Sequence, residues 1–396
     1  MSAAAAPDAR PLLDAGELIS ASQSATGLSD FGEKDPRESL QQLVRSLIGE
    51  AQLTPAGVAA KRASLIRVLS NRLLLQHEFA CRPQIAAERI TSPMVILGLP
   101  RSGTTKLHRM IAADPGMQKL PLWRLLYPVR ALTEGAGTDV ERRIAATEAY
   151  VEAIRTRSPA LYAGHPMLAH EPDEEYFAME ISFLAHLNTS SFHTPGYERW
   201  LDAQDFDNWY FWLERLLQYV QFDERNSGRP WVLKAPHHLG HLPLLTRYFP
   251  DVTVLHCHRD PVVAVASMCA LLYAARLSTS ACVNPADIGR YVLRVYSRRL
   301  AAYLRDRPDA ERTNRFVDVA YPDIVRDAPA VIHRAYAAAG IPLRAEALSA
   351  MQAWNASNQQ HKHGQHRYAL TDFGISEAEV ADAFGNYSTR FADYLR

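Results

Sequence analysis

Apolar residues recur at helical spacing in the first quarter of the chain. Leu40, Leu43 and Leu47 lie three or four positions apart, and a second set of leucines and valines repeats this spacing between residues 65 and 73. Such spacing lines one face of an α-helix with apolar side chains. The pattern predicts a tail and a helical lobe over residues 1–90, ahead of the first strand.

Four short apolar or β-branched runs further along the chain predict strands, and a helical pattern follows each of them. The predicted strands are residues 94–97, 231–233, 252–257 and 316–319, and the helices after them are residues 104–111, 239–248, 261–272 and about 322–339. Alternating strands and helices are typical of a parallel sheet that is covered on both faces. The sequence therefore predicts a three-layer α/β domain with a central, mostly parallel sheet over residues 91–396.

Residues 141–222, between the first and second predicted strands, have a mostly helical pattern and many aromatic side chains. Trp209, Trp212 and Leu216 belong to a broad apolar face in this region. Such a face either packs into the core or forms the wall of a pocket for an apolar molecule. We predict a helical insertion in the α/β domain, and both interpretations of its apolar face stay open.

Charge and composition narrow the range of partners. The chain has 43 lysine and arginine residues and 43 aspartate and glutamate residues, so no overall field attracts nucleic acid or an acidic membrane. Any anion site must therefore be local. No segment reaches the roughly 18 to 20 apolar residues of a membrane-spanning helix, and the first residues lack the pattern of a secretion signal.

The four cysteines show neither metal-binding spacing nor the density of a disulfide framework. This usage favours buried thiols in a reducing compartment, so we predict a cytoplasmic protein. The sequence leaves open whether the chain forms a homo-oligomer.

The segment VILGLPRSGTTKLH, residues 95–108, predicts a strand, a glycine-containing loop and a helix. The backbone N–H groups of such a loop and the positive end of the helix bind an anion. Nucleotide triphosphatases use G-x-x-x-x-G-K-[ST], but Thr104 stands here in place of the lysine, which argues against hydrolysis of ATP or GTP. The candidate anion-binding residues are the charged fork of Arg101 and, after it, Ser102, Gly103, Thr104 and Thr105.

The same loop carries a resemblance to a known family. The run G-L-P-R-S-G-T-T, residues 98–105, resembles the P-K/R-S-G-T-T signature of the sulfotransferases that use 3′-phosphoadenosine 5′-phosphosulfate (PAPS). In that family the loop binds the 5′-phosphosulfate, and bacterial members commonly have arginine at the position of Arg101. The resemblance spans residues 91–390. It implies a P-loop-like fold, PAPS as the donor, 3′-phosphoadenosine 5′-phosphate (PAP) as the product, and no metal.

A second segment, VLHCHRDPVVAVASM at residues 254–268, matches another part of the family pattern. The resemblance implies that an arginine at a strand end and a serine eight residues later hold the 3′-phosphate, and here these are Arg259 and Ser267. Arg259 could instead be an ion-pair partner of Asp260. Tyr321 is similar in position to the family tyrosine that lies against adenine, although a proline replaces the glutamate that follows it in the family. A core tyrosine is the alternative.

Transfer of a sulfuryl group needs positive charge at the transferring and leaving oxygens. The segment WVLKAPHHL resembles the family's L-K-x-P motif, and also the K-T-H-L-P of cytosolic members. It implies that Lys234 reaches the sulfuryl group, with Arg101 as the other candidate for charge stabilisation. The alternative is a strand-end lysine with a solvated amine.

The acceptor hydroxyl also needs a base for its proton. The segment GHPMLAHEPDEEY, residues 164–176, resembles the acceptor-side loop of bacterial members, in which glutamates follow a histidine. This points to His165 as the base, with Glu174 or Glu175 orienting it or acting directly. His237 is the competing base, by analogy with the histidine of K-T-H-L-P.

The nature of the acceptor and the role of the C-terminal part are less defined. The tract HKHGQHR, residues 361–367, resembles the basic loop that closes over the 3′-phosphate in sulfotransferases, with a metal site as the alternative. Aromatic and aliphatic residues at 176–222 favour a lipophilic alcohol, phenol or glycolipid as acceptor. The alternative functions are a P-loop nucleotide or small-molecule kinase and a non-catalytic adenine-nucleotide-binding protein.

Overall fold

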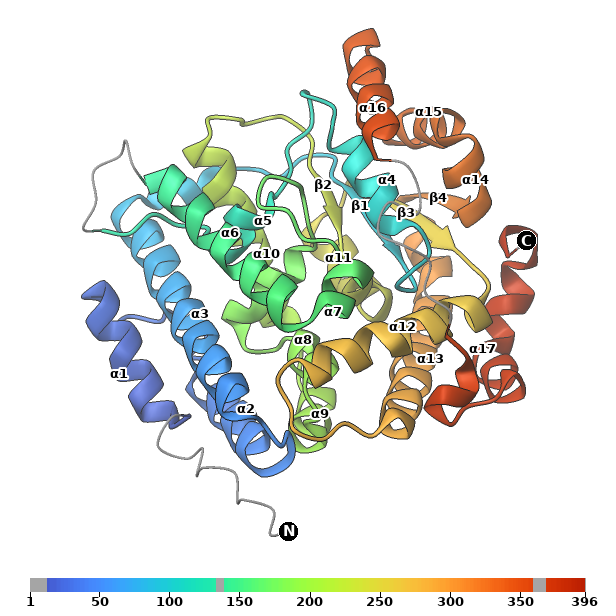
Figure 1. The fold of residues 1–396 in the computed structure, drawn as a ribbon. Helices are drawn as coiled ribbons and strands as arrows, with labels where there is room; N and C mark the ends of the chain where they lie inside the picture. Colours follow the sequence, from blue (N-terminus) through green and yellow to red (C-terminus); the bar gives the residue numbers. More distant parts are fainter. Residues whose placement is uncertain (1–12, 133–138, 359–367, 396) are drawn as a thin grey trace.

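A parallel four-stranded sheet forms the centre of the computed structural model, which describes residues 13–132, 139–358 and 368–395 (Figure 1). The strands are β1 (Met94–Gly98), β2 (Val232–Lys234), β3 (Thr253–His258) and β4 (Arg315–Ala320), in the spatial order β2-β1-β3-β4. All three neighbouring pairs are parallel. The predicted α/β fold with a parallel sheet is therefore confirmed, and each predicted strand is present within one or two residues.

Successive side chains of a strand point to opposite sides of the sheet, and helices cover both sides. Both faces of the sheet are therefore buried. Met94 and Ile96 face a smaller core, and Val95 and Leu97 face a larger one. The smaller core contains side chains of α4 (Thr104–Ile111), α14 (Tyr321–Arg326), α15 (Ala328–Ala339) and α16 (Ala345–Ser357). The larger core contains side chains of α10 (Asp207–Asp223), α12 (Pro261–Leu277), α13 (Pro285–Ala310) and α17 (Glu377–Arg390).

Three α-helices precede the first strand in the described part of the chain, of which the second and third follow the predicted apolar spacing, whereas the first lies in the segment predicted as a tail. They are α1 (Ala15–Thr26), α2 (Arg37–Glu50) and α3 (Pro55–Cys81), and the short η2 (Pro83–Ala87) leads from them to β1. Thr54 caps α3 by accepting a hydrogen bond from the Gly57 N–H (3.0 Å), and Pro55 supplies a first residue with a preset φ. In Figure 1 these helices lie at the left of the sheet, and α14 to α16 lie at its upper right.

The segment between α4 and β2 is helical, as predicted for residues 141–222. Its elements are α5 (Leu122–Leu126), α6 (Asp139–Arg157), α7 (Pro159–Gly164), η3 (Glu175–Ser182), α8 (His186–Ser191), α9 (Pro195–Asp202) and α10. Trp209 and Trp212 on α10 are each 1 % exposed and belong to the larger core. The structure thus decides between the two interpretations of this aromatic face: it packs into the core.

Two predicted helices are each divided in the structure. The run predicted at 322–339 breaks at Asp327, because Pro329 has no N–H for a continuous helix and the Asp327 side chain caps a new one through the Ala330 N–H (3.1 Å). The run predicted at 239–248 becomes η4 (Pro236–Gly240) and α11 (Leu242–Tyr248). The C-terminal part continues with η5 (Leu370–Phe373), α17 and η6 (Ala392–Tyr394).

The prediction that all four cysteines are buried is wrong for two of them. Cys257 and Cys269 are buried in the sheet and in α12, but Cys81 and Cys282 are exposed because they lie at a helix end and in a loop. Among the described residues, no helix combines the length and the apolar character that crossing a membrane requires.

Replacing Gly98 by alanine should destabilise the fold by about 1–3 kcal/mol or more, because Gly98 has φ 151° and a Cβ there would lie 2.4 Å from the Cys257 carbonyl oxygen. Gly385 in α17 is the matched control, since a Cβ there meets no atom within 4 Å. Gly385→Ala should stabilise the helix by about 0.5–1 kcal/mol. Urea unfolding of the two variants measures both changes, and equal stability of the two would contradict this account of the β1 end.

Candidate active site

The candidate residues gather at one edge of the sheet because all four parallel strands end there. The loop with Arg101 follows β1, Lys234 is the last residue of β2, Arg259 follows β3, and Tyr321 follows β4. β1 and β3 are neighbours in the sheet, while the chain from β1 first crosses to β2 on the other side. Such a change of direction opens a crevice at the carboxyl ends of the strands, where open α/β sheets bind their ligands.

The loop between β1 and α4 is held in shape by its own hydrogen bonds. The Ser102 hydroxyl donates to the Leu99 carbonyl (2.7 Å) and is fully buried, so it supports the loop from inside. Arg101 has φ 73°, a left-handed conformation that costs a non-glycine residue about 1–2 kcal/mol. Gly103 (φ 89°) precedes α4, so the first N–H groups of this helix, at Thr104 and Thr105, have no partner within it.

The side chains of Arg101 and Arg259 lie together beside Ser267. Arg101 Nε donates to Ser267 Oγ (3.2 Å), and Arg259 Nη1 donates to the Arg101 carbonyl (2.7 Å). Desolvation and, after it, the positive charge of Arg259 lower the pKa of Arg101. Two guanidinium groups that repel each other are stabilised by an anion between them. The sequence assigned Arg101 to the 5′ end of the donor, whereas its side chain contacts Ser267, the residue assigned to the 3′ end.

Arg259 also lies over the ring of Tyr321, with its guanidinium carbon 4.1 Å from the ring centroid. A cavity of about 1030 Å³ opens beside this pair. The predicted site residues that line it are Arg101, Gly103, Thr104, Thr105, His165, Arg259, Ser267 and Tyr321. Its wall also contains apolar side chains, among them Ala160, Leu168, Leu271, Tyr273, Ala274 and Phe373. Ser102, Lys234 and Glu174 lie outside the lining.

Lys234 lies directly behind this lining. Its Nζ donates to Glu174 Oε1 (2.6 Å) and lies 3.4 Å from the Oγ1 of Thr105, which does line the cavity. The Lys234 side chain is 1 % exposed, so the alternative of a solvated strand-end lysine does not describe it. Glu174 neutralises the buried charge, because an unpaired ammonium would be costly there.

His165 lies in the cavity wall and is oriented by Asp173. The Nε2 of His165 is 3.1 and 3.2 Å from the two carboxylate oxygens of Asp173. Burial alone would raise the pKa of Asp173, but the positive charges of His165, Lys234 and Arg109 and the His165 hydrogen bond hold it well below its usual range. An ionised carboxylate only accepts hydrogen bonds, so Nε2 of His165 carries the proton that lies between the two groups.

Glu175 binds the backbone of Lys234 and the side chain of His238. One of its carboxylate oxygens accepts from the Lys234 backbone N–H (2.9 Å), and the other lies 2.7 Å from Nε2 of His238. Nδ1 of His238 lies 2.8 Å from the Tyr210 hydroxyl. Burial would raise the pKa of Glu175, but these hydrogen bonds and the charge of His238 lower it. This network of Glu175, His238 and Tyr210 holds the end of β2 in place.

His237, the competing base, does not line the cavity. Its side chain is 3 % exposed and packs among Phe206, Trp209, His186 and His241 instead. The tract at residues 361–367 lies outside the described residues.

Three site residues were missed by the sequence interpretation. Asp173 is the partner of His165, Lys106 lines the cavity one residue after Thr105, and Arg109 lines it one helical turn later while lying 3.7 Å from Asp173. For Lys106 and Arg109 a signal existed, because residues of the first turns of α4 face the same side as the loop that precedes the helix.

A comparison with family models matches residues 93–345 to the model described as the sulfotransferase family. Among curated proteins, the omega-hydroxy-beta-dihydromenaquinone-9 sulfotransferase Stf3 of Mycobacterium tuberculosis is 23% identical over 310 residues, which cover 74% of this chain and 75% of that protein. The Stf3 of Mycobacterium bovis gives the same values.

Two solved structures have the same fold over nearly the whole chain. The sulfotransferase STF1 of Mycobacterium tuberculosis is 30% identical with a TM-score of 0.80, covering 95% of this chain and 99% of its own. The sulfotransferase STF9 of Mycobacterium avium is 26% identical with a TM-score of 0.83, covering 96% and 97%. The family model spans well over half of the chain. This protein therefore belongs to the sulfotransferase family and is an enzyme of sulfuryl transfer.

Proposed function

We propose that this enzyme transfers the sulfuryl group of PAPS to the hydroxyl of a lipophilic alcohol, phenol or glycolipid by direct in-line displacement. The observation that carries the proposal is the pair Arg101 and Arg259 beside Ser267, at the edge where α4 begins without a side-chain cap for its first N–H groups. A 3′,5′-bisphosphorylated adenosine carries two separate anions. This edge has two separate sets of donors, which fit them.

The residues divide into two groups by what they would bind. Arg259, Ser267 and the side chain of Arg101 fit the 3′-phosphate, and Tyr321 under Arg259 offers a ring for the adenine. The N–H groups and hydroxyls of Thr104 and Thr105 fit the 5′ end. When bound, PAPS supplies a sulfuryl group attached to a phosphate that can leave.

Lys234 would stabilise the charge on the oxygens that separate during transfer. Its Nζ lies 3.4 Å from Thr105 Oγ1 in a buried setting, where a positive charge acts more strongly than in water. Glu174 holds this ammonium in place. The role is supported by the position of Lys234 directly behind the loop that fits the 5′ end.

His165 would take the proton of the acceptor hydroxyl on its Nδ1, while Asp173 holds the Nε2–H. The apolar wall that includes Leu168, Leu271 and Tyr273 supports a lipophilic acceptor beside this base. The name of the relative Stf3 specifies an omega-hydroxy quinone derivative, which is a lipophilic alcohol of this class.

The rival activity in this family of folds is that of a kinase, which would use ATP. The proposal predicts that PAP raises the melting temperature by several degrees at about 100 times its dissociation constant, equivalent to about 2.7 kcal/mol, and that AMP and ATP at the same concentration do not. PAP alone among the three carries a 3′-phosphate. A larger shift with ATP than with PAP would favour the kinase.

Arg259→Ala should abolish most of the shift with PAP, because it removes the guanidinium group that would bind the 3′-phosphate and that lies over the ring of Tyr321. Arg290 on the exposed side of α13 offers a matched control, since Arg290→Ala removes an arginine whose one ion pair among the described residues is with Asp287. The shift should be unchanged in that variant. An undiminished PAP shift in Arg259→Ala would remove the 3′-phosphate assignment.

A further inference from the structure

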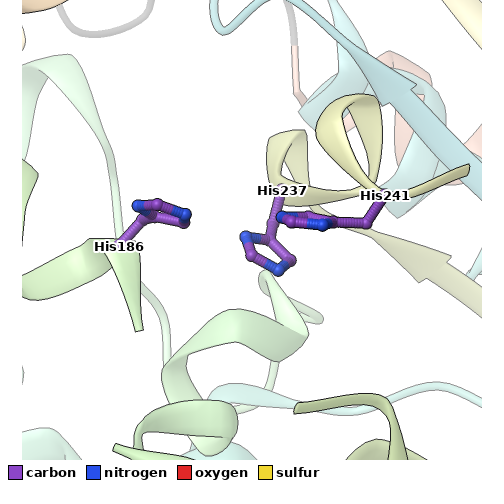
Figure 2. Close-up of side chains that lie close together, drawn as sticks. All are labelled: His186, His237 and His241. Atoms are coloured by element: carbon purple, nitrogen blue, oxygen red, sulfur yellow. The ribbon is translucent and has the colours of Figure 1, made fainter. Parts of the chain in front are cut away.

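Three histidines from two separate segments converge at η4 (Figure 2). His186 begins α8, His237 lies within η4, and His241 follows η4 directly. One ligand nitrogen from each ring lies within 4.8 Å of the other two. The sequence interpretation missed this cluster because 50 intervening residues separate His186 from the His237–His241 pair.

Two nitrogens of this cluster lack the partners that buried polar atoms normally have. His186 Nδ1 and His237 Nε2 are buried without a hydrogen-bond partner among the described residues. Orphaned buried nitrogens are rare and call for an explanation, such as an ion that the site binds. Phe206 stacks on His186, with ring centroids 5.1 Å apart, and Trp209 packs on His237, at 4.3 Å.

The three imidazoles are in the protonation state that binds a metal. Burial is the main cause that lowers the pKa of each, and for His241 it lowers the pKa to about 3. All three rings are therefore neutral at physiological pH, and a neutral imidazole has a lone pair for a metal ion.

We propose that His186, His237 and His241 bind one zinc ion. Three imidazole nitrogens and one water or anion form a common tetrahedral zinc site, and histidines at i and i+4 frequently ligate one ion. Zn–N distances of about 2.0–2.1 Å place two ligands of a tetrahedron about 3.4 Å apart, so ligand nitrogens that now lie within 4.8 Å of one another would move closer together on binding the ion.

A positively charged residue near the three histidines opposes the binding of a cation. The positive charge of Arg299 contributes to the lowered pKa of all three histidines, so it lies close enough to repel a metal ion. Its Nη2 is buried and has no partner among the described residues. An anionic fourth ligand, such as hydroxide or chloride, would reduce the charge of the ion and suit the nearby guanidinium.

A second cluster differs from the first because two of its three members already have hydrogen-bond partners. His256, His258 and Asp318 also lie close together, but both oxygens of Asp318 accept from Arg307 and His258 is bonded to Asp318 and Tyr387. Asp318 and His258 are therefore already engaged, whereas both nitrogens of His256 are buried without a hydrogen-bond partner among the described residues. The zinc proposal therefore rests on the first cluster only.

The zinc ion would act as a structural tie near the active site. His238, next to His237, bonds to Glu175, which in turn accepts from the Lys234 N–H. Joining α8 to η4 through the metal would hold the segment that follows β2 against the acceptor-side helices. The inference does not depend on the identity of the donor or acceptor.

The test is to express the full chain without a histidine tag in zinc-supplemented medium and to measure bound metal after gel filtration. We expect about one zinc ion per chain, and Co²⁺ in its place should give the absorption of a four-coordinate ion. His241→Asn and His186→Asn should each lose most of the metal. Arg299→Gln should bind zinc several-fold more tightly, because it removes the opposing charge.

Two control variants separate this site from other histidines. His333→Ala removes an exposed histidine of α15, and a triple variant removes His361, His363 and His366, which lie outside the described residues. Both should keep the zinc. Loss of zinc from the triple variant, or equal zinc in wild type and in both ligand variants, would overturn the proposal, as would wild-type protein without zinc.

Discussion

Lys234→Met should lower the rate of sulfuryl transfer by about 100- to 1000-fold, because it removes the buried charge nearest the loop that fits the 5′ end of the donor. Methionine preserves the length of the side chain but not its charge. The effect should appear mainly in kcat, since the residues that fit the 3′-phosphate are untouched. Steady-state kinetics with PAPS and a hydroxyl acceptor measure the split between kcat and KM.

The same substitution leaves Glu174 without its partner, and breaking a buried ion pair costs about 3–5 kcal/mol. The double variant Lys234→Met/Glu174→Gln removes both charges and should restore stability. Its rate should stay as low as that of the single variant. If the double variant recovered activity, Lys234 would act only by stabilising the fold.

The parts of the site that could be predicted from the sequence are those whose geometry is local. Arg101, Thr104 and Thr105 lie in the short turn between a strand and a helix and at the start of that helix, so their place at the same edge of the sheet follows from their spacing, although the side chain of Arg101 points to Ser267. Arg259 could be placed beside them because it ends a neighbouring parallel strand. The short turn between β1 and α4 restricts where the residues of this loop can lie.

The acceptor side could not be predicted because packing, and not spacing, decides where adjacent residues point. Asp173, Glu174 and Glu175 are consecutive, yet their carboxylates bind His165, Lys234 and His238, respectively. From the sequence, the glutamates were the candidates to orient the histidine, but the aspartate does so.

The same limit applies to the pair of histidines after β2. His238 bonds to Glu175, whereas His237 points to the opposite side and joins His186 and His241. Two neighbours on a tight helical turn face different surroundings, and the K-T-H-L-P analogy cannot tell them apart. The fold class was easier to predict, because alternating strands and helices permit few arrangements.

His165→Ala should lower kcat by about 100- to 10,000-fold, because it removes the proposed base, which lines the cavity while Asp173 holds its Nε2. A base, unlike a structural residue, can be replaced from solution. Added imidazole should therefore restore part of the activity of His165→Ala in a concentration-dependent way. The PAP thermal shift should be unchanged, since His165 does not belong to the groups that fit either phosphate.

Asp173→Asn separates orientation of the base from its presence. The amide nitrogen of asparagine can donate to Nε2 and thereby favours the tautomer in which Nδ1 carries the proton, so kcat should fall by at least about 10-fold while His165 is retained. Asp173→Glu keeps the negative charge and should recover part of the loss. Full activity of both Asp173→Asn and His165→Ala would transfer the role of base to Glu174, whose carboxylate already lies 2.6 Å from Lys234 Nζ.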